Sequence, residues 1–583
     1  MKNRGFARRC AFGFASLLAV LGALASATGA GAERASQPSS VQAGYLDAGY
    51  YHSCAVIAGG SVRCWGQGIN GKLGYLSSVG NVGDNELPSA VGPVSLGTGR
   101  TAVQVGAGEG RSCALLDNAT VRCWGSGGFG GLGYGTTEDV GDNESPASRG
   151  PVNFGTGRTV KAISVGNEAN CAILDNDTLK CWGQAGDGAL GYGNENNVGD
   201  NETPAAVGVV DLGPSDTVKA VSAGGAFTCA ILTNNTVKCW GLNDSGQVGL
   251  GIPATTAATL SIGDDPGEEP ANNDPVSLPG GQGAVAVAAG SKHVCVILTG
   301  GGVACWGEGI QGKLGYGNTT YIGDNEAPAT AGTVDLGSGR TAVAITAGDQ
   351  HSCAVLDNGS VRCWGGGFRG RTGHGSTDNI GDDAGEMPGV PVGLGAGRTA
   401  TAISAGAFHT CARRDDGSVI CWGASDSGTL GYGNSVDIGD NEAASAGGPL
   451  SLGSGPLPPT DTDGDGKPDS SDACPSVAGT PVSGCPNVPR TLSLAYRKGR
   501  FRGGLTANAK GCRSNVRVAV MKKVKALGGP DDKQVGTDRT ATDGRYQLDK
   551  KRKPGRYYAE VPAAIFATTG NCGAARSDIV RLK

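Results

Sequence analysis

Seven pairs of cysteines, each pair ten residues apart, recur along the chain, and Trp-Gly follows the second cysteine of every pair. The pairs are Cys54 and Cys64, Cys113 and Cys123, Cys171 and Cys181, Cys229 and Cys239, Cys295 and Cys305, Cys353 and Cys363, and Cys411 and Cys421. All seven tryptophans lie in these triplets, and successive pairs begin 59, 58, 58, 66, 58 and 58 residues apart. Such a period predicts propeller blades or solenoid units.

Composition narrows the fold class. The chain has 583 residues, of which 105 are glycine and 38% are hydrophobic. It is long enough for several cores but too rich in turn residues for a helical body. An all-β body is therefore predicted.

The N-terminus has the three parts of a secretory signal peptide. Lys2, Arg4 and two further arginines precede an apolar run over 11–25, and small residues follow up to Ala32. Cleavage near Ala32 is expected, so that 1–32 is a signal peptide and the protein is secreted or displayed on a cell surface. The apolar run is too short for a membrane span and no later segment approaches eighteen apolar residues, so no transmembrane span is expected.

The cysteine count agrees with export. Removing Cys10 with the signal leaves eighteen cysteines, enough for nine disulfides: the seven repeat pairs, Cys474 with Cys485, and Cys512 with Cys572. Zinc is the alternative, but zinc ligands come as close pairs with a second pair to complete four. A uniform spacing of ten therefore favours disulfides.

One repeat shows how such a pair can form. Ser352–Leu356 and Ser360–Gly365 are β-prone runs on either side of Asp-Asn-Gly, which predicts a hairpin. Folding about Asn358 places Cys353 opposite Cys363, close enough for a disulfide that stabilises the fold by about 2–3 kcal/mol or less.

Each repeat holds two more β-prone runs, such as 93–97 and 160–164. Four strands per period are typical of a propeller blade. The chain opens with one run type at 45–48 and ends with the other at 450–452, so the first run is expected to complete the last blade and close the ring.

The recurring strings Gly-x-x-His-x-Cys-Ala-x-Leu, Gly-Ser-Val-x-Cys-Trp-Gly and Gly-x-Leu-Gly resemble the repeat of the regulator of chromosome condensation family. The resemblance covers 41–455 and implies a seven-bladed β-propeller that binds partners through its loops and faces. That family includes a nuclear exchange factor and a secreted bacterial inhibitor of β-lactamases. The export signal, the cysteine pairs and the acidic insertions resemble a secreted bacterial type rather than the nuclear one.

The insertions carry a repeat of their own, (Val or Ile)-Gly-Asp-(Asn or Asp). Its acid is Asp84, Asp142, Asp200, Asp264, Asp324, Asp382 or Asp440, and Glu follows the Asn in five copies, as Glu86, Glu144, Glu202, Glu326 and Glu442. The side chains could hold turns through bonds to nearby backbone. Alternatively, they form a ring of carboxylates that binds cations or a basic partner.

No constellation for nucleophilic or metal catalysis is found in the sequence. His52, His293, His351 and His409 share one repeat position, where other repeats have Arg111, Ala169 or Phe227, and His374 stands where other repeats have tyrosine. These histidines are therefore predicted to be structural. No catalytic residue is predicted and the protein is not expected to be an enzyme, although a glycan-active enzyme would need only two carboxylates.

A Pro-rich and acidic linker follows over 456–488. Its acids alternate around a glycine turn, which converges the hard oxygen ligands that calcium prefers. The run resembles the thrombospondin type 3 repeat, and that resemblance implies calcium ligands at Asp461, Asp463, Asp465, Lys467 through its carbonyl, Asp469 and Asp472. Calcium is the expected cofactor, with a role in stiffening the link between domains.

The segment 489–583 is basic, with 22 Lys and Arg against 7 Asp and Glu. Alternating runs at 517–521 and 556–561 predict a small β-sandwich, which resembles transthyretin-like and immunoglobulin-like modules. Its charge could hold the protein to an anionic envelope polymer or to lipid headgroups, or could simply be solvated. Nucleic acid is not an expected partner, because no motif that reads bases accompanies the charge.

The features together predict a monomeric, exported binding or adhesion protein that recognises a partner through propeller loops. A secreted protein inhibitor of another enzyme is the first alternative, and a carboxylate-based glycan-active enzyme is the second. Aromatic side chains on the loops would favour the inhibitor. The candidates are Tyr75, Phe129, Tyr134, Tyr192, Tyr316, Tyr321, Phe368 and Tyr432, several of them expected in the blade core.

Overall fold

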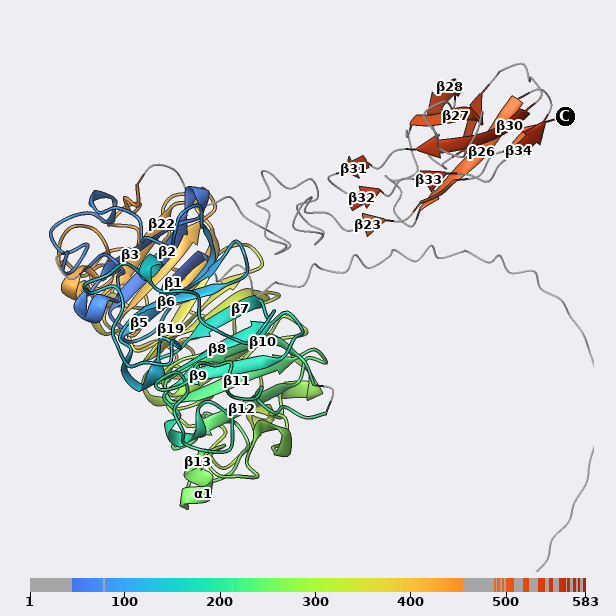
Figure 1. The fold of residues 1–583 in the computed structure, drawn as a ribbon. Coiled ribbons are helices and arrows are strands. Elements are labelled where there is room, and N and C mark those ends of the chain that lie inside the picture. The colour runs from blue at the N-terminus through green and yellow to red at the C-terminus, as the bar shows by residue number, and fades with distance from the viewer. Residues whose placement is uncertain are drawn as a thin grey trace, which may run out of the picture. The chain divides into compact units, whose positions relative to one another are not determined.

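The computed structural model describes residues 45–453, apart from 77, 78 and 215, and the backbone of strands between Asn487 and Leu582 (Figure 1). The predicted signal peptide and the predicted linker up to residue 486 lie outside these residues. Within them the fold is all-β, as the glycine-rich composition predicts.

Seven antiparallel sheets succeed one another along residues 46–423, each built from consecutive strands. In chain order they are β1 (Leu46–Ala48), β2 (His52–Ile57) and β3 (Ser61–Gly66); β4 (Ala102–Ala107), β5 (Arg111–Leu116) and β6 (Val121–Gly125); β7 (Val160–Val165), β8 (Ala169–Leu174) and β9 (Leu179–Gly183); β10 (Val218–Ala223), β11 (Phe227–Leu232), β12 (Val237–Leu242) and β13 (Ser261–Ile262); β14 (Ala284–Ala289), β15 (His293–Leu298) and β16 (Val303–Gly307); β17 (Ala342–Ala347), β18 (His351–Leu356) and β19 (Val361–Gly365); and β20 (Ala400–Ala405), β21 (His409–Arg414) and β22 (Val419–Gly423).

The second and third strands of each sheet form the hairpin that the sequence predicts. Cys353 lies directly opposite Cys363 in the register of β18 and β19, and the six other pairs are opposed in the same way. All seven pairs are joined as disulfides with Cα atoms 4.0–4.1 Å apart. Opposed residues approach this closely where their backbone hydrogen bonds point away from each other.

The prediction of four strands per repeat is wrong for six of the seven sheets, which have three strands. The run at 93–97 meets β3 through a single backbone bond, from the Val94 N–H to the Val62 carbonyl at 2.9 Å. The acidic insertion contributes one more isolated bridge, between Val82 and Gly66. Two separate contacts thus replace a continuous outer strand, and only the fourth sheet gains β13.

The prediction that residues 45–48 complete the last sheet is also wrong. β1 pairs with β2 and forms the first strand of the first sheet, while β20, β21 and β22 form the last sheet alone. The two ends meet through contacts between sheets. Ser89 N–H donates to the Ser451 carbonyl at 3.0 Å, and β1 packs against β20.

A cycle of seven glycines closes the ring where each first strand ends. A Cβ atom on Gly49 would lie 2.3 Å from the Gly108 carbonyl oxygen, and each later glycine approaches the next in the same way until Gly406 approaches Gly49 at 2.3 Å. The cycle runs Gly49, Gly108, Gly166, Gly224, Gly290, Gly348 and Gly406. Only glycine permits this close approach of backbones, which explains the residue at this repeat position.

The core lies between the sheets. Every residue of the seven second strands is buried, because each of these strands is covered on both faces by neighbouring sheets. All seven tryptophans are fully buried. Trp364 shows their role, since its Nε1 donates to the Lys313 carbonyl of the preceding repeat at 3.0 Å. The tryptophan therefore joins two sheets.

Helical segments are short. One α-helix, α1 (Ala257–Leu260), begins with a capping box between Thr256 and Thr259. The 3₁₀ turns are η2 (Ala58–Gly60), η3 (Ile69–Gly71), η4 (Pro88–Ala90), η5 (Gly128–Gly130), η6 (Pro146–Ser148), η7 (Gly186–Gly188), η8 (Pro270–Asn272), η9 (Pro279–Gly281), η10 (Ile310–Gly312), η11 (Pro328–Thr330), η12 (Phe368–Gly370) and η13 (Asp426–Gly428). Among the residues described, no helix is long and apolar enough to cross a membrane.

The C-terminal segment contains further strands. They are β23 (Asn487–Val488), β24 (Arg490–Leu492), β25 (Ala495–Arg497), β26 (Arg500–Ala507), β27 (Arg517–Lys523), β28 (Lys533–Arg539), β29 (Arg545–Leu548), β30 (Gly555–Val561), β31 (Ala564–Phe566), β32 (Gly570–Cys572), β33 (Ala575–Arg576) and β34 (Val580–Leu582). The two runs that the alternation predicts correspond to β27 and β30, which pair antiparallel.

Candidate functional site

Part of the predicted site set lies beyond the described residues. The six expected calcium ligands, Asp461, Asp463, Asp465, Lys467, Asp469 and Asp472, are outside them, as are Cys474, Cys485 and Cys512. Cys572 is described only as a backbone position in β32. Within the described part of the chain, no group of three or more His, Cys, Asp or Glu side chains could hold a metal ion.

The acidic insertions pack against the preceding repeat and hold local turns. The Asn81 amide donates to the Asp84 carboxylate at 3.3 Å, and the Gly439 N–H donates to the Glu442 carboxylate at 3.0 Å. A Cβ atom on Gly71 would lie 2.4 Å from the Asp142 nitrogen of the next repeat, so the insertion and this glycine are in close contact. These contacts favour the turn interpretation of the acidic motif.

Four histidines bridge neighbouring sheets through hydrogen bonds. His52, His293, His351 and His409 are fully buried. Each Nε2 lies 2.7–2.8 Å from a hydroxyl of the next sheet, and the partners are Ser112, Ser352, Thr410 and Ser53. Ser112, Ser352 and Thr410 donate their own proton to a backbone carbonyl, so the histidine Nε2–H donates to the hydroxyl. Burial lowers the pKa of all four imidazoles, which keeps them neutral.

Five of the loop tyrosines also have structural roles. The Tyr134 hydroxyl accepts from the Cys123 N–H at 3.0 Å and donates to the Cys123 carbonyl at 3.0 Å. Tyr75, Tyr192, Tyr316 and Tyr432 accept the corresponding N–H bond in their own repeats. Burial raises the pKa of Tyr75, Tyr316 and Tyr432 to about 12. The hydroxyls of these five tyrosines are therefore bonded within their own repeats.

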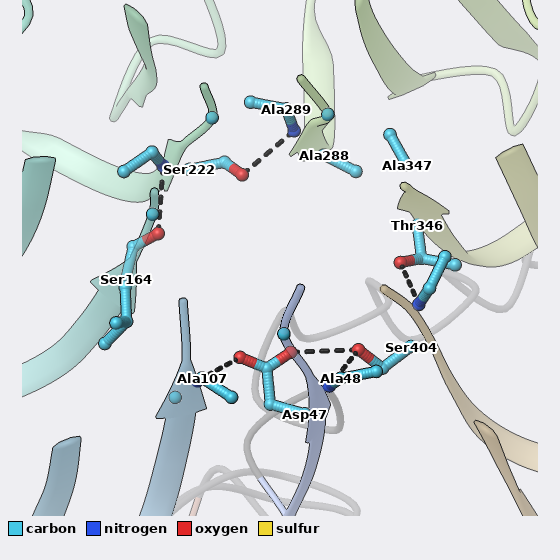
Figure 2. Close-up of a pocket in the computed structure, with 18 of the residues that line it drawn as sticks. Asp47, Ala48, Ala107, Ser164, Ser222, Ala288, Ala289, Thr346, Ala347 and Ser404 are labelled. Carbon is cyan, nitrogen blue, oxygen red and sulfur yellow. Dashed lines mark hydrogen bonds between the residues drawn. The ribbon is translucent and has the colours of Figure 1, made fainter. Parts of the chain in front are cut away.

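The first strands of the seven sheets line a narrow central channel of about 240 Å³. Figure 2 shows how polar side chains bridge successive strands across its wall. Asp47 accepts from the Ala107 N–H at 2.8 Å and from the Ser404 hydroxyl at 2.9 Å. Ser164, Ser222 and Thr346 accept an N–H of the next strand. Burial raises the pKa of Asp47 to about 6. The channel is small and its polar groups are already paired with backbone.

Loops at one end of the sheets form a continuous face, here called the turn face. It comprises the loop between the first and second strand of each sheet and the turn that follows each third strand. These loops lie on one side of the ring, because successive ones are hydrogen-bonded. Tyr50 N–H donates to the Gly108 carbonyl at 3.2 Å, and Gly225 N–H donates to the Gly290 carbonyl at 3.1 Å.

Large apolar side chains project from the tips of four turns on this face. Phe368 is 58% exposed, Ile69 and Phe129 are 57% exposed, and Ile310 is 37% exposed. Phe129 holds this position at a φ of 54°, a left-handed conformation that is rare for a bulky residue. Of the aromatic candidates in the sequence, Phe129 and Phe368 are thus the exposed ones. Tyr321 is half-buried, and its hydroxyl lies 3.5 Å from the Glu308 carboxylate. Ile69 and Ile310 occupy the same turn position as Phe368, and the sequence analysis did not identify them as candidates.

An aromatic cluster lies on the same face beside the glycine cycle. Tyr51 stacks on Phe408, with ring centroids 5.7 Å apart, and Tyr50 meets both rings edge-on. All three side chains are half-buried. They connect the first sheet to the last and give the turn face an apolar centre.

A groove of about 360 Å³ runs from this cluster across the first three sheets. Tyr51, Ile69 and Phe129 supply apolar walls, and Glu109 and Glu168 supply carboxylates. Lys72 lies over the Tyr51 ring, 5.7 Å from its centroid, and donates to Gln67 at 2.8 Å. The groove is a concave part of the turn face and is the candidate functional site.

Comparisons with known proteins agree with the repeat architecture. Residues 102–130, 218–247, 342–371 and 400–429 match the family model described as the regulator of chromosome condensation (RCC1) repeat. Ultraviolet-B receptor UVR8 of Arabidopsis thaliana is 27% identical over 342 residues, which are 58% of this chain and 68% of that protein. E3 ubiquitin-protein ligase HERC2 of Homo sapiens is 27% identical over 384 residues, 65% of this chain but 7% of HERC2.

Among solved structures, human WBSCR16 aligns with a TM-score of 0.48 and 21% identity, over 63% of this chain and 85% of that one. Yeast RCC1 (Prp20), solved with Kap60, aligns with a TM-score of 0.47 and 20% identity, over 62% and 77% of the two chains. Four segments of this chain thus match the repeat of the regulator of chromosome condensation family, and the chain is similar to two proteins at 27% identity.

Proposed function

We propose that the protein is an exported binding protein whose ring is a seven-bladed propeller that recognises a partner protein through the turn face. The single observation that carries this proposal is the exposure of Phe129 and Phe368 at turn tips. Large, rigid side chains of this kind supply most of the energy of protein interfaces. Two relatives of the chain are named as a receptor and a ubiquitin ligase, and a binding role for the ring accords with those names.

The remaining parts of the chain complete the proposal. Residues 1–32 would direct export, 41–455 would form the propeller, 456–488 would bind calcium, and 489–583 would form a basic β-sandwich. Seven disulfides in the described part of the chain support an oxidising compartment. The basic C-terminal module would hold the protein near an anionic envelope polymer while the turn face binds its partner.

A secreted inhibitor of another enzyme remains the second candidate, because the same exposed aromatic tips favour it. The aromatic cluster of Tyr50, Tyr51 and Phe408 gives the turn face an apolar centre, and the ring of tips surrounds it. Such a face could cover the active site of another protein. Inhibition and simple adhesion differ in whether the captured partner is an enzyme that loses activity when bound.

The test is affinity capture from the producer's envelope and culture fluid, with the full-length protein and with Phe129→Ala combined with Phe368→Ala. The proposal expects a protein that the wild type retains and that the double variant loses by at least tenfold. Val390→Ala is the control, because Val390 is 66% exposed in a loop away from the turn face. Equal capture by the double variant would refute a role for this face.

A further inference from the structure

Basic residues of the C-terminal segment gather at one end of one sheet. In that sheet β27 pairs with β28 and β30, and β30 pairs with β34 as well (Figure 1). Arg556 of β30 lies opposite Lys523 of β27 and, on the other edge of β30, opposite Arg581 of β34. Residues directly opposite each other in antiparallel strands share a face of the sheet. The three positions therefore form a row across adjacent strands, here called the cation row.

The cation row has no acidic neighbour among the described strand positions. The positions next to it in the register are Met521, Lys522, Gly555, Tyr557, Tyr558, Val580 and Leu582. The acidic residue of β30 is Glu560, which is about 13 Å along the strand from Arg556 and lies opposite Arg576. Lys522, beside the row, lies opposite Lys533 of β28. This end of the sheet therefore carries positive charge that no carboxylate of the described strands offsets.

Such a row destabilises the sheet unless an anion accompanies it. Like charges directly opposite each other are unfavourable. Neighbouring strands lie about 4.8 Å apart, which is less than the screening length of about 8 Å at physiological salt. Solvated charge, the alternative, does not require this arrangement, because the 22 basic residues of 489–583 could all stand in loops or opposite neutral residues. A bound anion would replace the repulsion by attraction.

The residue types in the row favour phosphate over carboxylate. Arginine binds phosphate through parallel N–H bonds, and lysine binds it as a point charge. A terminal phosphate offers three acceptor oxygens and a carboxylate offers two, so a phosphate is more easily shared between neighbouring cations. The row crosses two gaps between strands and spans about 10 Å, which is more than one phosphate covers. A polymer with successive phosphate groups would engage all three positions.

We propose that the cation row of Lys523, Arg556 and Arg581 binds successive phosphate groups of an anionic envelope polymer. The inference rests on the proposed function, in which the basic C-terminal module holds the protein near such a polymer, and it adds the binding position and the chemistry of the ligand. Because the attraction is between charges, binding weakens as the salt concentration rises. Removing the three charges of the row weakens binding more than removing three charges elsewhere in the module.

The test is isothermal titration calorimetry on the full-length protein in calcium-free buffer, with sodium polyphosphate and poly-L-glutamate of equal charge. Polyphosphate is expected to bind at least tenfold more tightly than polyglutamate. Lys523→Gln combined with Arg556→Gln and Arg581→Gln should weaken polyphosphate binding at least tenfold. Equal binding of the two polymers, or unchanged binding by this triple variant, would overturn the inference.

A matched control removes the same charge from scattered positions. Arg490, Arg502 and Arg539 lie on β24, β26 and β28, and none of them is opposite another. Arg490→Gln combined with Arg502→Gln and Arg539→Gln should change polyphosphate affinity less than twofold. An equal loss in both triple variants would show that net charge binds the polymer without the row, and the proposal would be refuted.

Arg556→Lys combined with Arg581→Lys keeps the charge and provides a second variant in case the first does not fold. It should weaken polyphosphate binding at least threefold, because lysine lacks the planar fork of arginine; full affinity would contradict the role given to the two arginines. Scanning calorimetry without ligand should show the glutamine variant of the row to be at least as stable as the wild type, since like-charge neighbours are lost.

Vesicles of phosphatidylcholine with phosphatidylglycerol test a lipid source of phosphate. Tighter binding to these vesicles than to polyphosphate would make the row a headgroup site and exclude the polymer. The two proposals fail separately. Capture of a protein that depends on Phe129 and Phe368, with equal polyphosphate binding by the wild type and the glutamine variant of the row, would retain recognition through the turn face and remove this inference.

Discussion

The buried histidines predict how the ring responds to acid. The His409 Nε2 lies 2.7 Å from the Ser53 hydroxyl, and its Nδ1 is buried without a partner. The charged imidazolium carries a proton on both ring nitrogens, and no acceptor receives the one on Nδ1. Burial accordingly lowers the pKa of His409 from 6.5 to about 3. The unfolded chain binds a proton near pH 6.5, so stability is complete above that pH and is lost as the pH falls toward 3.

The magnitude follows from the two pKa values. Each pKa unit corresponds to about 1.4 kcal/mol, so His409 alone should cost about 2.5 kcal/mol of unfolding free energy on going from pH 7 to pH 4.5. Asp47 acts in the opposite direction, because its raised pKa of about 6 destabilises the folded state at neutral pH and not in acid. The effect of one histidine must therefore be isolated by a variant.

The fourth and fifth sheets show which residues can replace this histidine and its hydroxyl partner. Phe227 and Val294 occupy the positions that His409 and Ser53 hold elsewhere, and both are fully buried. A Cβ on Gly224 would lie 2.8 Å from the Phe227 ring, much as one on Gly406 would lie 2.6 Å from the His409 ring. The two rings therefore occupy similar space, and the double variant His409→Phe with Ser53→Val should fold.

Urea unfolding followed by tryptophan fluorescence is the assay, because all seven tryptophans lie in the ring. At pH 7 the double variant should differ from the wild type by less than about 1 kcal/mol. Between pH 7 and pH 4.5, the double variant should lose about 2 kcal/mol less unfolding free energy than the wild type loses. Identical pH profiles would show that His409 does not resist protonation and would refute the argument.

Three further predictions concern single side chains. Trp364→Ala should cost about 3–5 kcal/mol of unfolding free energy by leaving a cavity between two sheets, and a change below about 1 kcal/mol in urea unfolding would contradict this packing role. Tyr134→Phe should cost about 2 kcal/mol, since the Cys123 N–H and carbonyl lose their shared partner; Tyr321→Phe, whose hydroxyl contacts Glu308 only at 3.5 Å, is the control and should be nearly neutral. Phe129→Gly should leave the ring as stable or up to about 1 kcal/mol more stable, because glycine accepts a positive φ, and lower thermal stability would count against strain at this tip.

The local parts of the fold could be predicted from the sequence. Cys353 and Cys363 lie opposite each other because the Asp-Asn-Gly turn between them determines the hairpin register, and this information is contained within about a dozen residues. The outer edge of each sheet could not be predicted in the same way. The Val94 run meets β3 across more than thirty residues, and only tertiary packing decides whether two such contacts become a strand.

The candidate site was predicted in part, because composition alone does not show which side chain of a turn points into solvent. Phe129 and Tyr134 are five residues apart in one glycine-rich turn and would serve equally well as partner anchors by composition. The turn folds Tyr134 back onto Cys123 and directs Phe129 into solvent. Comparison of the repeats distinguishes the two positions. Tyrosine recurs at the position of Tyr134, whereas the position of Phe129 is variable and holds Asn70, Asp187, Gln311, Arg369 or Ser427 in other repeats.

Variation at the position of Phe129 would let rings of the same fold present different binding faces, as the proposed function requires. Six tip residues, among them Phe129 and Arg369, have φ values of 54–58°, a conformation that costs a non-glycine residue about 1–2 kcal/mol. Glycine would remove that cost, and it stands at the next residue of each of these turns. Contacts between neighbouring sheets are made at other repeat positions. There, histidine bonds to a hydroxyl, tryptophan donates to a backbone carbonyl, and glycine backbones approach each other closely. The Arg369 tip binds Asp426 and Asp437 of the next repeat, whereas the Phe129 side chain is 57% exposed. The proposed contact with a partner would explain a strained apolar side chain at that tip.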